Sequence, residues 1–175
     1  MSATPDLTIA LTRHRDGSTS LRLTRADGSA TWQRNHDAPG AFFPPHDLTH
    51  LAVETVLGHR RGFYGLVAEG WGLGDFGAPW PRGRLDDTDP SELIVGFLDR
   101  TGLDEQSAAR AADLNAAASV YFAERPAALG GLGRWRDLTD EDLAAVRRAA
   151  RALIAQWRAV PLGGTLTLTF TRAAA

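Results

Sequence analysis

The residues best suited to metal binding or catalysis lie together in the segment PHDLTHLAVE, residues 45–54. His46 and His50 are four positions apart, so on a helix both imidazoles project from one face and can bind the same divalent metal ion, such as zinc. Asp47 follows the first histidine directly and can hold or deprotonate a bound water. The spacing predicts a metal centre in which His46 and His50 are ligands and Asp47 is the catalytic residue.

A third ligand has to come from another part of the chain. Glu54 lies eight positions beyond His46, about 12 Å along a straight helix, which suits an outer partner that orients His50 better than a shared ligand. We expect Glu69 to be the third metal ligand. It is the only charged residue of its apolar segment, and the glycine-flanked turn before that segment should bring it opposite His50. Asp75 and Glu54 remain alternatives.

The five residues 46–50, HDLTH, resemble the HExxH zinc motif of metalloproteases, with aspartate in place of glutamate. Glu69 then has a spacing similar to that of the downstream glutamate ligand of gluzincins. The same residues resemble the HDxxH zinc motif of a family of ubiquinone-biosynthesis proteins, whose glutamate ligand would fall at Gly62 here. The blocks HDLTH and GLVAEGW together resemble short bacterial proteins without assigned function, and this last resemblance implies no reaction.

A second interpretation needs no metal. The helix expected from about Asp47 to Leu57 carries its ionisable residues in one stripe, which could be a solvated face with Asp47 as the N-cap. Glu69 would then be neutralised by an arginine such as Arg60. The chain is thus either a metal-dependent hydrolase or lyase-like enzyme with an unidentified small-molecule or peptide substrate, or a non-enzymatic binding or regulatory module.

Before this helix, residues 7–34 predict a three-stranded antiparallel meander, because apolar and polar residues alternate and two Asp-Gly turns separate the runs. Pro44 and Pro45 disfavour helix before them and favour a helix start after them.

The Gly- and Pro-rich segment 72–87 predicts a long loop. Trp80 would pin this loop to the surface, or the loop would cover the histidines and offer Arg82 and Arg84 to an anionic substrate.

Helices dominate the second half of the chain. Asp89 as N-cap and Glu92 at the third helical position predict a helix that ends at Gly102. An alanine-rich helix should span residues 104–124, where Asn115 would bond to backbone or water, or reach the site. A capping box that begins at Thr139 opens a further helix.

Residues 165–171 alternate threonine with apolar side chains and predict a last strand that joins the meander. The result is an α+β fold, a small antiparallel sheet of the three-stranded meander plus the C-terminal strand, packed by four to five helices in one domain, 1–175. The outer face of this sheet is rich in threonine. We expect this face to meet water or a second copy of the chain in a homodimer.

Composition excludes several classes of protein. The 175 residues include no cysteine, so a metal would have to be held by His, Asp or Glu. A net charge of -2 without a basic stripe argues against nucleic acid as a partner. No apolar run approaches the roughly 20 residues needed to cross a membrane, and no secretory signal is recognisable. We expect a soluble, cytoplasmic protein with no membrane partner.

Overall fold

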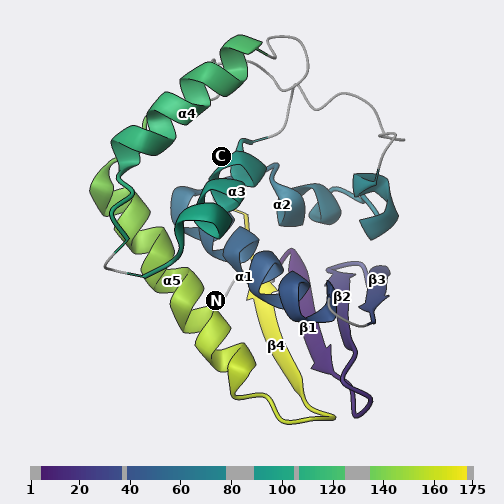
Figure 1. Cartoon of the computed structure of the whole chain (residues 1–175). Coiled ribbons are helices and arrows are strands. Elements are labelled where there is room, and N and C mark those ends of the chain that lie inside the picture. The colour runs from purple at the N-terminus through teal and green to yellow at the C-terminus, as the bar shows by residue number, and fades with distance from the viewer. Residues whose placement is uncertain (1–4, 37–38, 78–88, 105–106, 125–134, 173–175) are drawn as a thin grey trace.

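The computed structural model describes residues 5–36, 39–77, 89–104, 107–124 and 135–172. Within them, a four-stranded antiparallel sheet and five α-helices form an α+β fold, which confirms the predicted fold class (Figure 1). The helices gather on one side of the sheet. The loop residues Trp80, Arg82 and Arg84 lie outside the described residues, so the two alternatives for this loop, a cover over the histidines or a surface loop pinned by Trp80, stay predictions.

The sheet has the strand order β3-β2-β1-β4. Its strands are β1 (Leu7–Arg13), β2 (Thr19–Arg25), β3 (Ala30–Asn35) and β4 (Thr165–Phe170). Each Asp-Gly pair lies in a turn between strands, as predicted, but as its third and fourth residues rather than as a primed two-residue turn: Gly17 and Gly28, both with φ of 84°, donate their N–H groups to the carbonyls of His14 and Arg25. The C-terminal strand pairs antiparallel with β1, with Leu7 opposite Phe170, and thereby completes the meander as expected.

The two faces of the sheet differ in burial. The face toward the helices is apolar and buried, and its members include Leu7, Ile9, Leu11, Leu21, Leu23 and Phe170. The other face exposes Thr8, Thr167 and Thr169, together with Trp32, whose exposed fraction is 63%. This division follows from the period of two in each strand. A homodimer across the threonine-rich face stays a prediction.

The helical elements are α1 (Pro39–Leu57), α2 (Phe63–Ala68), the short 3-10 helix η1 (Leu73–Phe76), α3 (Ser91–Thr101), α4 (Ala111–Glu124) and α5 (Asp140–Arg158). The sequence-based start of α1 at Asp47 is wrong, since the helix continues through Pro44 and Pro45. Proline already has helical φ, but inside a helix it removes a backbone hydrogen bond and its ring crowds the carbonyl four positions earlier; α1 nevertheless contains both prolines, and Pro44 is buried.

The predicted start of α4 is also wrong. The helix begins at Ala111, because the Asp113 carboxylate accepts the backbone N–H of Arg110 at 2.7 Å and so caps the helix there. Asn115 bonds to the backbone of Leu138 in both directions, at 2.9 and 3.0 Å, and does not serve the site. The capping box at Thr139 is present as predicted.

The central element is α1, which packs against α5, α3 and α2 (Figure 1). Leu48 and Leu51 belong to a core cluster with the sheet and the C-terminal part of α5. Val53 belongs to a second cluster, formed with α3, α4 and the N-terminal part of α5. Because α1 lies between the two clusters, it offers solvent little surface. Among the described residues, no helix has both the length and the apolar character that a bilayer crossing requires.

Candidate metal centre

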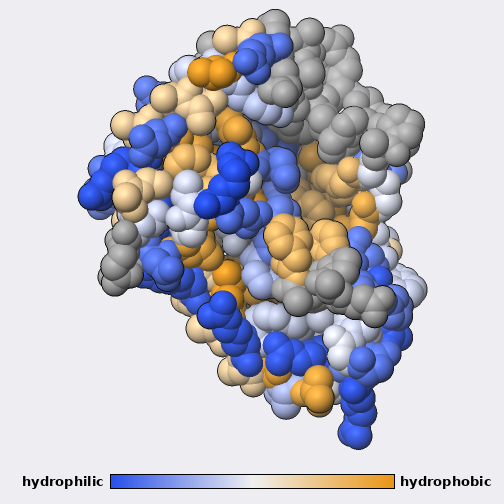
Figure 2. Space-filling view, viewed as in Figure 1, coloured by the Kyte–Doolittle hydropathy of each residue, from blue (hydrophilic) through white to orange (hydrophobic). Residues whose placement is uncertain are grey.

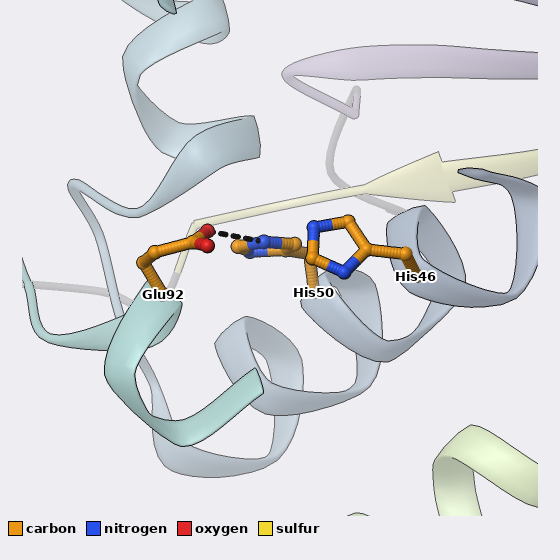
Figure 3. Close-up of side chains that lie close together, drawn as sticks. All are labelled: His46, His50 and Glu92. Carbon is orange, nitrogen blue, oxygen red and sulfur yellow. Dashed lines mark ion pairs between the residues drawn. The ribbon is translucent and has the colours of Figure 1, made fainter. Parts of the chain in front are cut away.

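Three donor side chains converge where α1 meets α3 (Figure 3). His46 and His50 project from successive turns of α1, and Glu92 reaches toward them from the first turn of α3. One ligand atom from each residue lies within 4.8 Å of the others, and no other group of three in the described ranges meets this condition. We call this group the His-His-Glu triad.

Each histidine has a carboxylate beside its Nδ1 atom. His46 Nδ1 donates to Asp99 Oδ2 of α3 at 2.9 Å. His50 Nδ1 lies 3.7 Å from Glu54 Oε1, longer than a hydrogen bond but within ion-pair distance. Such partners fix the ring orientation and leave Nε2 for a metal, and the Nε2 of His50 lies 3.0 Å from Glu92 Oε2. Glu54 thus lies where an outer partner of His50 has to be.

The carboxylate of Glu54 is held from a second side. It is 1% exposed and accepts the backbone N–H groups of Tyr64 and Gly65, at 3.0 and 3.2 Å, from the start of α2. Burial raises the pKa of Glu54, while His50 and the two N–H groups act in the opposite direction. The predicted stripe is therefore not a solvated face, because Glu54, Asp47 and His50 are all buried.

His50 is held between two carboxylates. Burial alone would lower its pKa, but Glu54 and Glu92 outweigh burial and raise the pKa of His50 to about 9. The same contact holds the pKa of Glu92 below its usual range. Without metal, His50 is consequently protonated at neutral pH, and a metal ion has to displace this proton in order to bind.

Asp47 lines a cavity that His46, His50 and Glu92 also line. Burial raises the pKa of Asp47 to about 7, against the effect of the His50 charge. Its Oδ2 atom has no hydrogen-bond partner among the described residues. Asp47 lies inside α1, so its predicted role as N-cap is wrong. A carboxyl group that titrates near neutral pH is suited to transfer protons as a general acid or base.

Glu69, the expected third ligand, does not join the triad. The segment after the turn is the short helix α2, and Glu69 lies at its C-terminal cap instead of opposite His50. Its carboxylate bonds Arg61 Nε at 3.1 Å and lies 3.7 Å from Arg172 Nη1. Neutralisation by arginine was anticipated, although with Arg60 as the partner. Asp75, the alternative ligand, instead accepts the backbone N–H of Gly72, the N-cap residue of η1, at 2.8 Å.

Glu92 and Asp99 are the site residues that the sequence-based prediction missed. Glu92 had been assigned to a helix cap with Asp89, yet Asp89 Oδ2 accepts the N–H groups of Arg60 and Arg61, both at 2.7 Å. The available signal was the spacing, because Glu92 and Asp99 are seven positions apart and so share one face of α3. Nothing local indicates that this face meets the histidines.

A cavity of about 490 Å³ lies beside the triad. Its lining includes His46, His50, Glu92 and Asp47 together with many apolar side chains, among them Phe63. Figure 2 shows hydrophobic side chains in a hollow of the surface near α2. The donors therefore face a space in which a small molecule fits.

No protein-family model matches the chain, and no curated protein and no solved structure matches it. The resemblances of HDLTH to zinc motifs stay predictions. An assignment of function consequently rests on the geometry of the triad and its cavity.

Proposed function

We propose that the chain is a divalent-metal-dependent enzyme of the hydrolase or lyase type, with the ion held by His46, His50 and Glu92. The observation that carries this proposal is the placement of three donors within 4.8 Å of one another on the wall of a cavity. Two histidines and one carboxylate form a donor set of catalytic zinc sites, in which a further coordination position is left for water or substrate.

Each neighbouring residue then has a separate role. A bound zinc or related ion would polarise the substrate and make a water more acidic. Asp47 takes up and returns protons at its carboxyl group. Asp99 and Glu54 orient His46 and His50 through their Nδ1 atoms, and Glu92 closes the donor set from α3. We expect Asp99→Asn to weaken zinc affinity by about 10- to 100-fold.

One observation favours the rival function, a binding or regulatory module without metal. With a pKa of about 9, His50 is a cation that is already ion-paired with Glu54 and Glu92. Such an arrangement is electrostatically satisfied without a metal ion. Metal binding would then be absent, and substitutions at His50 would lower stability or partner binding.

Elemental analysis of protein purified without a histidine tag separates the two functions. We expect one zinc, manganese, nickel or iron ion per chain in the wild type and loss of that ion in His46→Ala, His50→Ala and Glu92→Gln. Glu69→Gln is the matched control, because it removes a carboxylate that is bound to arginines outside the triad. This control should retain the ion.

The far-ultraviolet circular dichroism spectrum of each variant shows whether it is folded. A folded wild-type protein that holds no stoichiometric metal, even after dialysis against zinc, contradicts the proposed enzyme and favours the rival module. Retention of the ion in Glu92→Gln would show that Glu92 is not needed as a ligand and that the two histidines hold the ion without it.

A further inference from the structure

Aromatic side chains form much of the cavity beside the triad. The ring of Phe63 lies 5.5 Å from that of His50 and 4.9 Å from that of Phe76. Trp71 lies against Phe76 with their ring centroids 5.4 Å apart. Tyr121, from α4, also lines the cavity. These ring contacts hold the apolar lining in place before any ligand arrives.

The polar side chains around the same cavity are largely engaged by the protein itself. Ser91 is hydrogen-bonded to His59 at 2.7 Å. The Asp89 carboxylate accepts two backbone N–H groups at 2.7 Å, and Arg61 donates to Glu69 at 3.1 Å. Once these engaged groups are set aside, the charged anchors in the described part of the lining are the triad and its neighbouring carboxyl group, with Gln33 as a neutral polar side chain.

The size of the cavity limits the ligand further. A volume of about 490 Å³ lies within the range of about 300–1,000 Å³ that is typical of small-molecule sites. It accommodates an aromatic ring or a branched acyl chain together with the group that meets the metal. Apolar contact then supplies most of the affinity, and the metal supplies orientation.

We propose that the site binds a small molecule with an apolar, aromatic or branched body and one metal-binding oxygen donor, such as a carboxylate or an activated carbonyl. This inference rests on the proposed function, because the donor needs a metal ion at the triad. It adds the chemical class of the substrate. The body of the ligand lies among the phenylalanines, and the donor lies at His46, His50 and Glu92.

The first test uses two hydroxamic acids that share a metal-binding group. Acetohydroxamic and benzohydroxamic acid are titrated calorimetrically into the zinc-loaded full-length chain. We expect the phenyl compound to bind at least about 30-fold more tightly, since each buried methylene contributes about fourfold. Equal affinities for the two hydroxamic acids would overturn the proposed substrate class without contradicting the proposed metal site.

Leu93 provides a variant that alters the cavity without disturbing the core. It lines the cavity but belongs to neither core cluster, so Leu93→Ser should fold normally and reduce the preference for the phenyl compound about threefold or more. Val120→Ser is the matched control, because Val120 is 59% exposed on α4. An unchanged preference in Leu93→Ser would also count against the inference.

A metal-independent measurement separates this inference from the proposed function. Metal-free protein is titrated with N-phenyl-1-naphthylamine, a neutral apolar probe whose fluorescence rises in apolar sites. We expect the probe to bind the metal-free wild type. Leu93→Ser should weaken this binding, and Val120→Ser should leave it unchanged. If the wild-type chain takes up no zinc in the elemental analysis but still binds the probe, the metal anchor is overturned along with the proposed function, whereas the apolar ligand is retained. Absence of probe binding would overturn the apolar ligand itself.

Discussion

His50 connects the groups of the candidate site. Its Nε2 atom lies 3.0 Å from Glu92 and its Nδ1 atom 3.7 Å from Glu54, while its ring packs edge-on against His46 with centroids 4.9 Å apart. One imidazole thus ties α1 to α3 and, through Glu54, to the start of α2. The same ring can hold a proton between two carboxylates or give up that proton to a metal ion.

The protonation of His50 should make the stability of the metal-free protein depend on pH. The folded-state pKa is raised from 6.5 to about 9, so the stabilisation is fully present below about pH 6.5 and is lost as the pH rises through 9. We expect the free energy of unfolding in urea to fall across this window by an amount on the order of 3 kcal/mol. His50→Gln should remove this dependence, and His36→Gln, at an exposed position, should preserve it.

Asp47 also makes the free energy of unfolding fall as the pH rises, but over a lower pH range. Its pKa is raised from 3.8 to about 7, so its contribution is present below pH 3.8 and is lost as the pH approaches 7. Above pH 7, the difference in the pH dependence of the free energy of unfolding between the wild type and His50→Gln therefore reports on His50. A pH-independent unfolding free energy between pH 7 and 9 in the wild type would contradict the described ion pairs.

Helix α2 supplies part of the site through its close approach to α1. A Cβ atom on Gly65 would meet the backbone carbonyl of Arg60, and one on Gly62 would meet the side chains of Glu54 and Ser91. The two glycines thus allow the first N–H groups of α2 to reach the Glu54 carboxylate. The position of Glu54, and through it that of His50, depends on this contact between helices.

Gly65→Ala should accordingly destabilise the protein by about 2 kcal/mol or more, because a backbone carbonyl cannot move aside as a flexible side chain can. Gly74→Ala is the control, since a Cβ atom there meets nothing within 4 Å. Urea denaturation of both variants measures the difference. Equal stabilities would show that α2 can shift away from Arg60 at little cost.

Arg25 joins the sheet to the elements that line the cavity. From the end of β2 it donates to the carbonyl of Val67 in α2 and to that of Trp71, both at 2.6 Å. These bonds cross from the sheet to residues 67–71, which comprise the end of α2 and the connection toward η1. They fix to the sheet a segment that joins two elements lining the cavity, α2 through Leu66 and η1 through Leu73.

Arg25→Met should lower the free energy of unfolding by about 2 kcal/mol, because two part-buried carbonyls lose their charged donor. Arg22→Met is the matched control, since Arg22 is exposed on the same strand. Amide hydrogen exchange should also become faster around residues 67–71 in Arg25→Met, while the strands stay protected. Unchanged exchange there would show that the segment is held by apolar packing alone.

Local sequence patterns were sufficient for much of the fold. The period of two and the Asp-Gly turns predicted the strands, and the capping box at Thr139 located the start of α5. The pattern also predicted that His46 and His50 share one side of a helix. All of these depend on neighbours within a few positions, where backbone geometry determines which side chains lie together.

Only the tertiary structure decided which carboxylate meets the histidines. Glu69 was a reasonable expectation from its place in the chain, but the helical path of α2 brings it to Arg61, and the packing of α3 on α1 brings Glu92 to His50. The burial of Asp47 has the same origin. A periodic pattern defines the faces of an element, whereas the partner of each face depends on how distant elements pack, which no local spacing encodes.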